Sequence, residues 1–185
     1  MTTIVLFAAL VFFVFAQAAS ARSGAQSAAD AAALAAAQQA REDLLLDLAE
    51  AIGSGDEDWL DWLDLPGDGL PAEGALAAAQ ELAAANDSTV LGLQSTEVGG
   101  FPGFRVEVET TDTVGDSIIP GTENLTAEAQ ATAVIQPRCD FDLDADPTKL
   151  VTLVCDGQPV DIDPEKFNPG DLPDASVMFS VRLAE

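Results

Sequence analysis

The chain of 185 residues contains no histidine and no tyrosine, and only two lysines and two cysteines. Without histidine, a serine or cysteine nucleophile has no imidazole base, and acid–base chemistry would depend on carboxylates or lysine. The sequence also lacks the glycine–lysine phosphate loop, the dinucleotide-binding glycine pattern and any cysteine pair spaced for zinc or haem. We therefore expect a protein that is not an enzyme and that needs no cofactor.

Basic residues are scarce: seven lysines and arginines stand against 32 acidic residues, which gives a formal net charge of −25. No charged side chain precedes Arg22, so the whole excess lies in residues 22–185. Such a surface repels the phosphates of nucleic acids, and we exclude DNA and RNA as partners. Because 48% of the residues are hydrophobic, the chain still has enough apolar material for a folded core.

An uncharged, mostly apolar run of eighteen residues extends from residue 4 to residue 21, the minimum length for a membrane span. A secretory signal peptide has a similar composition, and Ala19-Ser20-Ala21 fits its cleavage pattern. We interpret residues 1–21 as a retained single-pass anchor in the cell membrane, with the C-terminal domain on the extracytoplasmic side. Cleavage near Ala21 and secretion is the alternative.

Residues 22–87 predict a helical stalk followed by short helices. No proline interrupts the helical pattern between residue 4 and about residue 52, alanine dominates its middle, and Gly53 is expected to end it. The spacing of Ser54 and Glu57 fits a capping box that opens a short amphipathic helix over 56–65. A third helix is expected over 72–87.

Residues 88–185 predict a β-rich domain, because the hydrophobic period changes to two. Alanines alternate with polar residues over 126–135, and a strand with an alanine face can approach the alanine-rich helix 24–40 closely. The predicted fold class is α+β, in which a long N-terminal membrane-anchoring helix packs the second half of its length on an antiparallel sheet. The expected strands are 88–95, 104–114, 125–136, 149–155, 159–162 and 176–183.

Cys139 and Cys155 are sixteen positions apart and flank an aspartate-rich turn and a predicted strand. This pattern favours a structural disulfide in an oxidising compartment. Closing a loop of this length would stabilise the fold by about 3 kcal/mol. Two unpaired, partly buried thiols are the alternative.

Four carboxylates, Asp140, Asp142, Asp144 and Asp146, alternate with other residues between the two cysteines. Their spacing is similar to the start of a calcium-binding loop. The pattern then fails, since Ala145 occupies the position that requires glycine. Both a solvated acidic turn and a weak calcium site are compatible with these residues, and calcium is the one ion that we consider as a ligand.

The segment SGAQSAADAAALAAAQQAR, residues 23–41, resembles the segment that follows the membrane helix in TadE/TadG-like proteins of tight-adherence (Flp) pilus systems. The resemblance implies a minor pilin or pilus-assembly component that acts through contact with other pilus or membrane-helix proteins, in homo- or hetero-oligomers. The contact face that we expect on this helix comprises Gln26, Ala29, Asp30 and Ala33. The alternative function is a secreted acidic binding module that takes calcium at the aspartate-rich turn.

Overall fold

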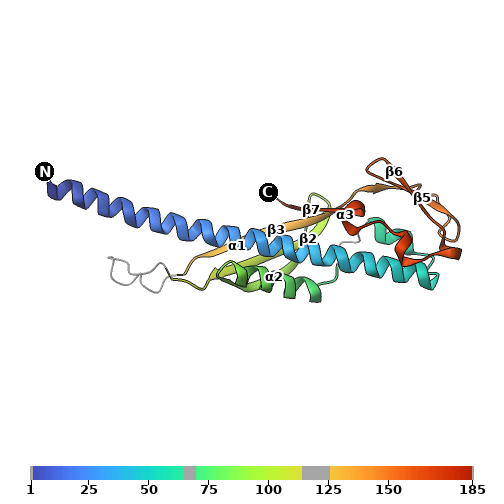
Figure 1. Cartoon of the computed structure of the whole chain (residues 1–185), viewed down its shortest axis with the longest axis horizontal. Coiled ribbons are helices and arrows are strands. Elements are labelled where there is room, and N and C mark those ends of the chain that lie inside the picture. Colours follow the sequence, from blue (N-terminus) through green and yellow to red (C-terminus); the bar gives the residue numbers. More distant parts are fainter. Residues whose placement is uncertain (1, 65–69, 114–125, 185) are drawn as a thin grey trace.

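The computed structural model describes residues 2–64, 70–113 and 126–184. Its longest element is helix α1 (Thr2–Ser54), which has 53 residues and is about 80 Å long. The unbroken N-terminal helix expected from the sequence is therefore confirmed (Figure 1). The helix ends two residues later than expected, because Gly55, with a φ of 75°, adopts the left-handed conformation that closes it, and Gly53 stays helical.

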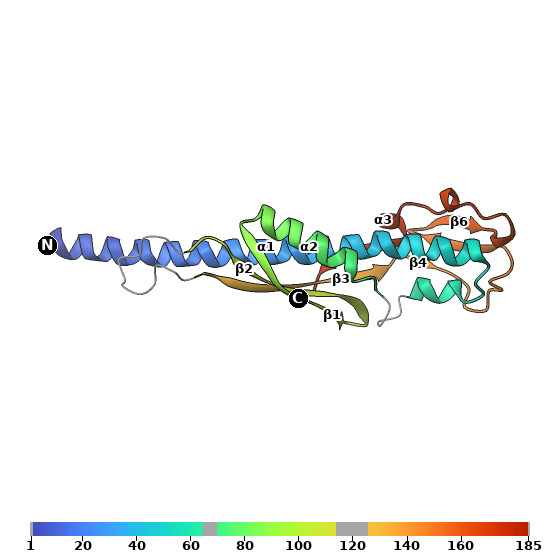
Figure 2. The same cartoon turned by 90° about the horizontal axis from the view of Figure 1, so that it is seen from below.

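A four-stranded antiparallel sheet covers the middle of α1 (Figures 1 and 2). Its strand order is β1-β2-β3-β7, so that β1 and β7 are the two edges. Gly99 and Gly100 connect β1 to β2, and their positive φ angles are those of a two-residue hairpin turn. The strands are β1 (Ser88–Val98), β2 (Phe101–Thr110), β3 (Glu128–Pro137) and β7 (Phe179–Leu183).

Helix α1 packs on the inner face of this sheet through small side chains. Ala131 and Ala133 of β3 are buried, as are most alanines of α1 between Ala25 and Ala40. The neighbouring strand β2 adds larger buried residues, including Phe104. The predicted packing of an alanine-faced strand against the alanine-rich helix is confirmed.

Helix α2 (Glu73–Ala85) packs beside α1 and runs antiparallel to it (Figure 2). Its buried residues are Ala75, Ala79 and Ala83, four positions apart, so one alanine stripe faces the core. At the start of α2, a Cβ added to Gly74 would lie 3.2 Å from Cγ of Gln39. The absence of side-chain bulk allows the two helices to approach closely.

A smaller three-stranded sheet lies beside the distal end of α1, and its apolar residues join the same core as the larger sheet. The indole of Trp59 is buried there and donates from Nε1 to the carbonyl oxygen of Pro147 at 2.9 Å. The elements of this end are β4 (Cys139–Asp140), β5 (Val151–Cys155), β6 (Gln158–Ile162), η1 (Trp59–Asp64), η2 (Pro164–Lys166), η3 (Pro169–Asp171) and α3 (Ala175–Met178).

Two expectations for local structure were wrong in detail. The helix expected over 56–65 is only the 3-10 helix η1, and the Ser54 hydroxyl bonds to the carbonyl oxygen of Ala51 instead of forming a capping box. The strand expected over 176–183 begins as the helical turn α3 and becomes extended only at Phe179. Tertiary packing decides both, since Trp59 and Met178 each turn inward to the core.

Within the described parts of the chain, no helix offers an apolar stretch sufficient to cross a bilayer. Helix α1 continues through residues 21 and 22 without a break. The division of the chain at residues 21 and 87 stays a prediction.

Candidate functional site

The N-terminal part of α1 projects beyond both sheets and presents large apolar side chains to the surroundings (Figure 1). Ile4 is 74% exposed, Phe12 is 77% exposed and Phe13 is 60% exposed. Single exposed apolar residues are ordinary on protein surfaces, but a helix that carries several of them together marks an interaction site. The projecting helix is therefore the first candidate for the functional surface.

Among the side chains of α1 whose burial the structure describes, the first buried one is Ala25, next to Gly24. The alanine-rich segment 23–41 consequently lies mostly inside the fold. Ala29 and Ala33, which we expected on a face that contacts other proteins, are fully buried by the chain's own elements. These two residues are not available as an intermolecular surface, because the chain's own core occupies that side of the helix.

Gln26 links the helix to strand β3, and Asp30 accepts a second hydrogen bond from the same side chain. The side-chain amide of Gln26 donates to Oδ1 of Asp30 at 2.8 Å and to the carbonyl oxygen of Gln130 at 3.3 Å. Gln130 lies in β3 just beyond the point where β7 stops pairing, so its carbonyl would otherwise face an open edge. Contact of Gln26 or Asp30 with other proteins stays a prediction, and the link to Gln130 was not visible in the sequence.

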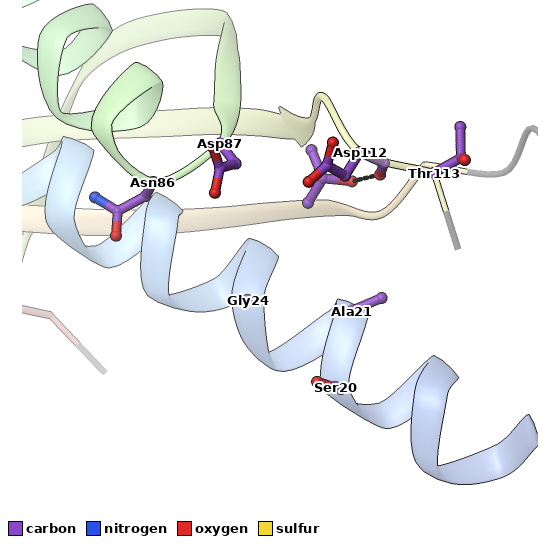
Figure 3. A pocket seen from close by; sticks show the side chains of 8 residues that line it. Ser20, Ala21, Gly24, Asn86, Asp87, Asp112 and Thr113 are labelled. Atoms are coloured by element: carbon purple, nitrogen blue, oxygen red, sulfur yellow. Dashed lines mark hydrogen bonds between the residues drawn. The ribbon is translucent and has the colours of Figure 1, made fainter. Parts of the chain in front are cut away.

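A cleft of about 330 Å³ lies where α1 leaves the domain (Figure 3). Small residues of α1 line one side and the polar end of α2 and the end of β2 line the other. The Thr110 hydroxyl donates to the carbonyl oxygen of Asp112 at 3.0 Å. The lining residues are Ser20, Ala21, Gly24, Asn86, Asp87, Thr110, Asp112 and Thr113. Small and polar side chains therefore line this cleft.

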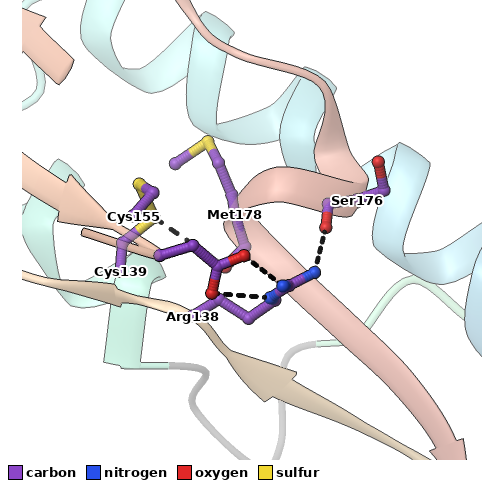
Figure 4. The surroundings of a disulfide bond; sticks show 6 residues. Arg138, Cys139, Cys155, Ser176 and Met178 are labelled. Atoms are coloured by element: carbon purple, nitrogen blue, oxygen red, sulfur yellow. Dashed lines mark hydrogen bonds and ion pairs between the residues drawn. A yellow bond between two sulfur atoms is a disulfide. The ribbon is translucent and has the colours of Figure 1, made fainter. Parts of the chain in front are cut away.

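The predicted disulfide between Cys139 and Cys155 is present. The two cysteines face each other across β4 and β5. Next to them, the Arg138 guanidinium forms a forked ion pair with Asp156 and donates to the carbonyl oxygen of Ser176 at 3.0 Å (Figure 4). The disulfide and Arg138 together join the small sheet to the segment that leads into β7.

The aspartate-rich turn is held by bonds within itself and to lysine. Oδ1 of Asp142 accepts the backbone N–H of Asp144 at 3.0 Å. Asp146 pairs with Lys149, and hydrogen bonds from Lys149 and Thr148 hold the pKa of Asp146 well below its usual range. Among the residues that the structure describes, no three acidic, histidine or cysteine side chains are arranged to hold a metal ion. Calcium binding at Asp140, Asp142, Asp144 and Asp146 stays a prediction.

Carboxylates gather on the distal part of α1 in what we call the acidic ridge: Asp43, Asp47 and Glu50. Partial burial, together with the negative charges of Asp43 and Glu50, raises the pKa of Asp47. The last turn of the helix carries no basic residue, although a cation would be favoured at this negative end of the helix dipole. The ridge is therefore an electrostatically unfavourable feature of the isolated chain.

Comparison with known proteins gives one match. The Tad family model, described as Flp pilus-assembly TadE/G-like, matches residues 1–39, which comprise the projecting part of α1 and the start of its buried part. Neither the curated proteins nor the solved structures gave a match. The N-terminal 39 residues of this chain are therefore TadE/TadG-like in sequence and relate it to a pilus-assembly family, as the alanine-rich segment predicted.

Proposed function

We propose that the chain is a pilus-assembly component that docks through the projecting part of α1 and acts by protein contact, not by catalysis. The observation that carries this proposal is the group of exposed large apolar residues at 4–13, on a helix whose continuation is fixed inside a folded domain. Moving one such side chain out of water stabilises a complex by about 1.5–3 kcal/mol. The match of residues 1–39 to a pilus-assembly family supports the same role.

The environment that we propose for the projecting helix is the cell membrane, where it meets the helices of other pilus components. Small residues such as Ala16 and Ala19 are exposed on it and would permit close packing with neighbouring helices. We place the C-terminal domain on the extracytoplasmic side, because the Cys139–Cys155 disulfide persists in an oxidising compartment. A finer role as a minor pilin is part of this proposal.

The buried half of α1 is fixed inside the domain and therefore holds the projecting half in position. The helix continues unbroken from residue 2 to residue 54, and its distal part is held by both sheets and by α2. A force on the domain is therefore transmitted along hydrogen-bonded helix to the docked end. This geometry suits a component that has to hold a domain at a set distance from an assembly.

The proposal is tested by placing charges on the projecting helix of the full chain in its host. We expect Phe12→Glu combined with Phe13→Glu to release the protein from the membrane and sheared-pilus fractions, because charged groups oppose burial in an apolar environment. Leu46→Glu is the matched control, since Leu46 is 67% exposed on the same helix but lies beside the domain. Equal fractionation of the two variants would contradict the proposal.

The intact mass of the protein separates this function from a secreted binding module. A chain that starts near residue 1 in the membrane or sheared fraction supports the anchored component. A chain that starts at Arg22 in the medium would replace the proposal with the secreted module. Calcium would then be titrated into that released chain. A rise in the stability of its aspartate-rich turn would indicate that calcium is the ligand.

A further inference from the structure

Two of the seven basic residues lie on the outer face of the four-stranded sheet, on either side of β3, without a carboxylate partner. Within the described ranges 2–64, 70–113 and 126–184, Arg105 and Arg182 form no ion pair. Four other cations do, and these pairs are Arg41–Glu42, Arg138–Asp156, Lys149–Asp146 and Lys166–Asp163. In a chain with 32 acidic residues, two exposed arginines that avoid ion pairs are unexpected.

The register of the sheet brings these two arginines to the same face. Arg105 of β2 pairs with Thr132 of β3, and Arg182 of β7 pairs with Val134, two residues further along β3. Both arginines are exposed, whereas Phe104, the neighbour of Arg105, is buried on the inner face. Because alternate residues of a strand point to opposite faces, the arginines lie on the face away from α1.

Both guanidinium groups are held in place by neighbours on the same face. The Arg182 guanidinium lies over the ring of Phe101, 5.9 Å from its centre, and its Nε lies 3.5 Å from Oε1 of Gln136. Nε of Arg105 donates to the Thr132 hydroxyl at 3.4 Å. A guanidinium has five N–H donors, so each arginine keeps at least two free N–H groups for a carboxylate of a partner. We call this surface the arginine face: Gln94, Phe101, Arg105, Thr132, Gln136 and Arg182.

We propose that the arginine face docks the acidic ridge of a second copy of this chain. Arginine pairs with carboxylates in a forked geometry that supplies both strength and direction. The ridge offers Asp47 and Glu50 on a helix end that has no basic residue in its last turn. Partial burial and the negative charges of Asp43 and Glu50 raise the pKa of Asp47, and a cation placed there would offset those charges.

The two surfaces cannot meet within one molecule. The ridge belongs to α1, which packs on the inner face of the sheet, and the arginine face is the opposite side of that sheet. The contact is therefore between different patches of two copies, and such a contact repeats into a chain of molecules. The inference does not depend on the projecting helix, so it can fail or succeed independently of the proposed pilus function.

The net charge of −25 opposes self-association at low salt. At about 0.15 M salt the screening length is about 8 Å, so repulsion between distant charges fades while contacts at the surface persist. We expect association to rise from low to physiological salt and to fall again at about 1 M, where even close pairs are screened. Glu107, an exposed carboxylate two residues from Arg105 on the same strand, adds to the repulsion at low salt.

The test measures self-association of the full chain in detergent micelles by sedimentation velocity. Arg105→Glu with Arg182→Glu should weaken association about tenfold or more. Lys149→Glu with Lys166→Glu changes the net charge equally on another part of the surface and should leave association within about twofold. A wild-type chain that stays monomeric at every salt concentration overturns the proposal, and so does equal weakening by both double variants.

A charge exchange identifies the second surface. The variant Asp47→Lys with Glu50→Lys should also fail to associate with itself, yet it should associate with the Arg105→Glu, Arg182→Glu variant when the two are mixed. Circular dichroism confirms that each variant is folded, and all four positions are at least partly exposed. If the mixed variants do not associate, the acidic ridge is not the partner of the arginine face and the proposal is wrong.

Discussion

The two halves of α1 are both helical and both carry apolar side chains, yet the environments of those side chains are opposite. The half before Gly24 carries large side chains such as Phe12, which is 77% exposed. The half after Gly24 carries alanines that are almost completely covered by the sheet and by α2. Alanines of the second half, together with Leu44 and Leu48, are thus in the core, whereas Phe12 of the first half faces outward.

The difference shows that side-chain size sets how closely a backbone can be packed, while hydrophobicity alone does not decide what is buried. An alanine helix buries little area per residue, but it allows a sheet and a second helix to approach from two sides. Among the residues that the structure describes, no helix or strand packs on the exposed large residues of the projecting half. This exposed apolar surface is the reason for our proposal that the helix docks on a partner outside the domain.

The largest expected change in the free energy of unfolding comes from removing a large side chain from the packed half of α1. Leu48→Ala should lower the free energy of unfolding by about 3 kcal/mol, because Leu48 is fully buried and the cavity would fill only in part. Leu46→Ala, two positions away and 67% exposed, should change it by less than about 0.5 kcal/mol. Urea unfolding of the full chain measures both, and similar losses would mean that the two sides of the helix are packed alike.

Replacing one alanine by leucine in each half of α1 compares how tightly the two halves are packed. Ala33→Leu should cost about 2 kcal/mol, because Ala33 is fully buried and the core has no room for three more carbon atoms. Ala16→Leu makes the same change in the projecting half, where Ala16 is exposed, and should leave the free energy of unfolding almost unchanged. Thermal unfolding followed by circular dichroism compares them. A matching loss for Ala16→Leu would show that the projecting half is packed in the isolated chain.

The boundary between the halves is tested by Gln26. Gln26→Leu removes the donor to the Gln130 carbonyl and should lower the free energy of unfolding by about 1 kcal/mol. Amide hydrogen exchange near Gln130 should become faster. Gln38→Leu is the control, since Gln38 is exposed on the same helix. Unchanged exchange in the Gln26 variant would show that this bond does not hold the edge of β3.

The smallest effect is a gain of stability at the acidic ridge. The folded chain raises the pKa of Asp47, so its charged form is disfavoured on folding, and this penalty is fully present above the folded pKa. Asp47→Asn should therefore stabilise the chain by about 0.5 kcal/mol at pH 7. The gain should disappear as the pH falls through the folded pKa toward the unfolded value. Denaturant titrations at pH 7 and at low pH test this, and a loss of stability at pH 7 would contradict it.

Much of the fold could be predicted because its signals are local. The length of α1 follows from an uninterrupted run of helix-forming residues, and helix α2 and strand β3 follow from their periodicity. The 3-10 helix η1 and the turn α3 could not be predicted in the same way. Their conformations are set by the burial of Trp59 and Met178 against residues distant in the sequence.

The features of the candidate site were likewise predictable from the sequence only in part. The disulfide between Cys139 and Cys155 could be predicted because only two cysteines are present. The contact face on α1 could not, since a run of small residues fits another protein's helix and the chain's own sheet equally well. Burial of Ala29 and Ala33 decides for the sheet.

The sequence by itself determined a long N-terminal helix, its change from large to small apolar residues, its acidic surface and its resemblance to TadE/TadG-like proteins. Only the tertiary structure decided that the alanine segment lies in the core, that Gln26 reaches the edge of β3 and that Arg105 and Arg182 share one face. The physical reason is that strand register and helix packing join residues many positions apart, and local patterns carry no record of that pairing.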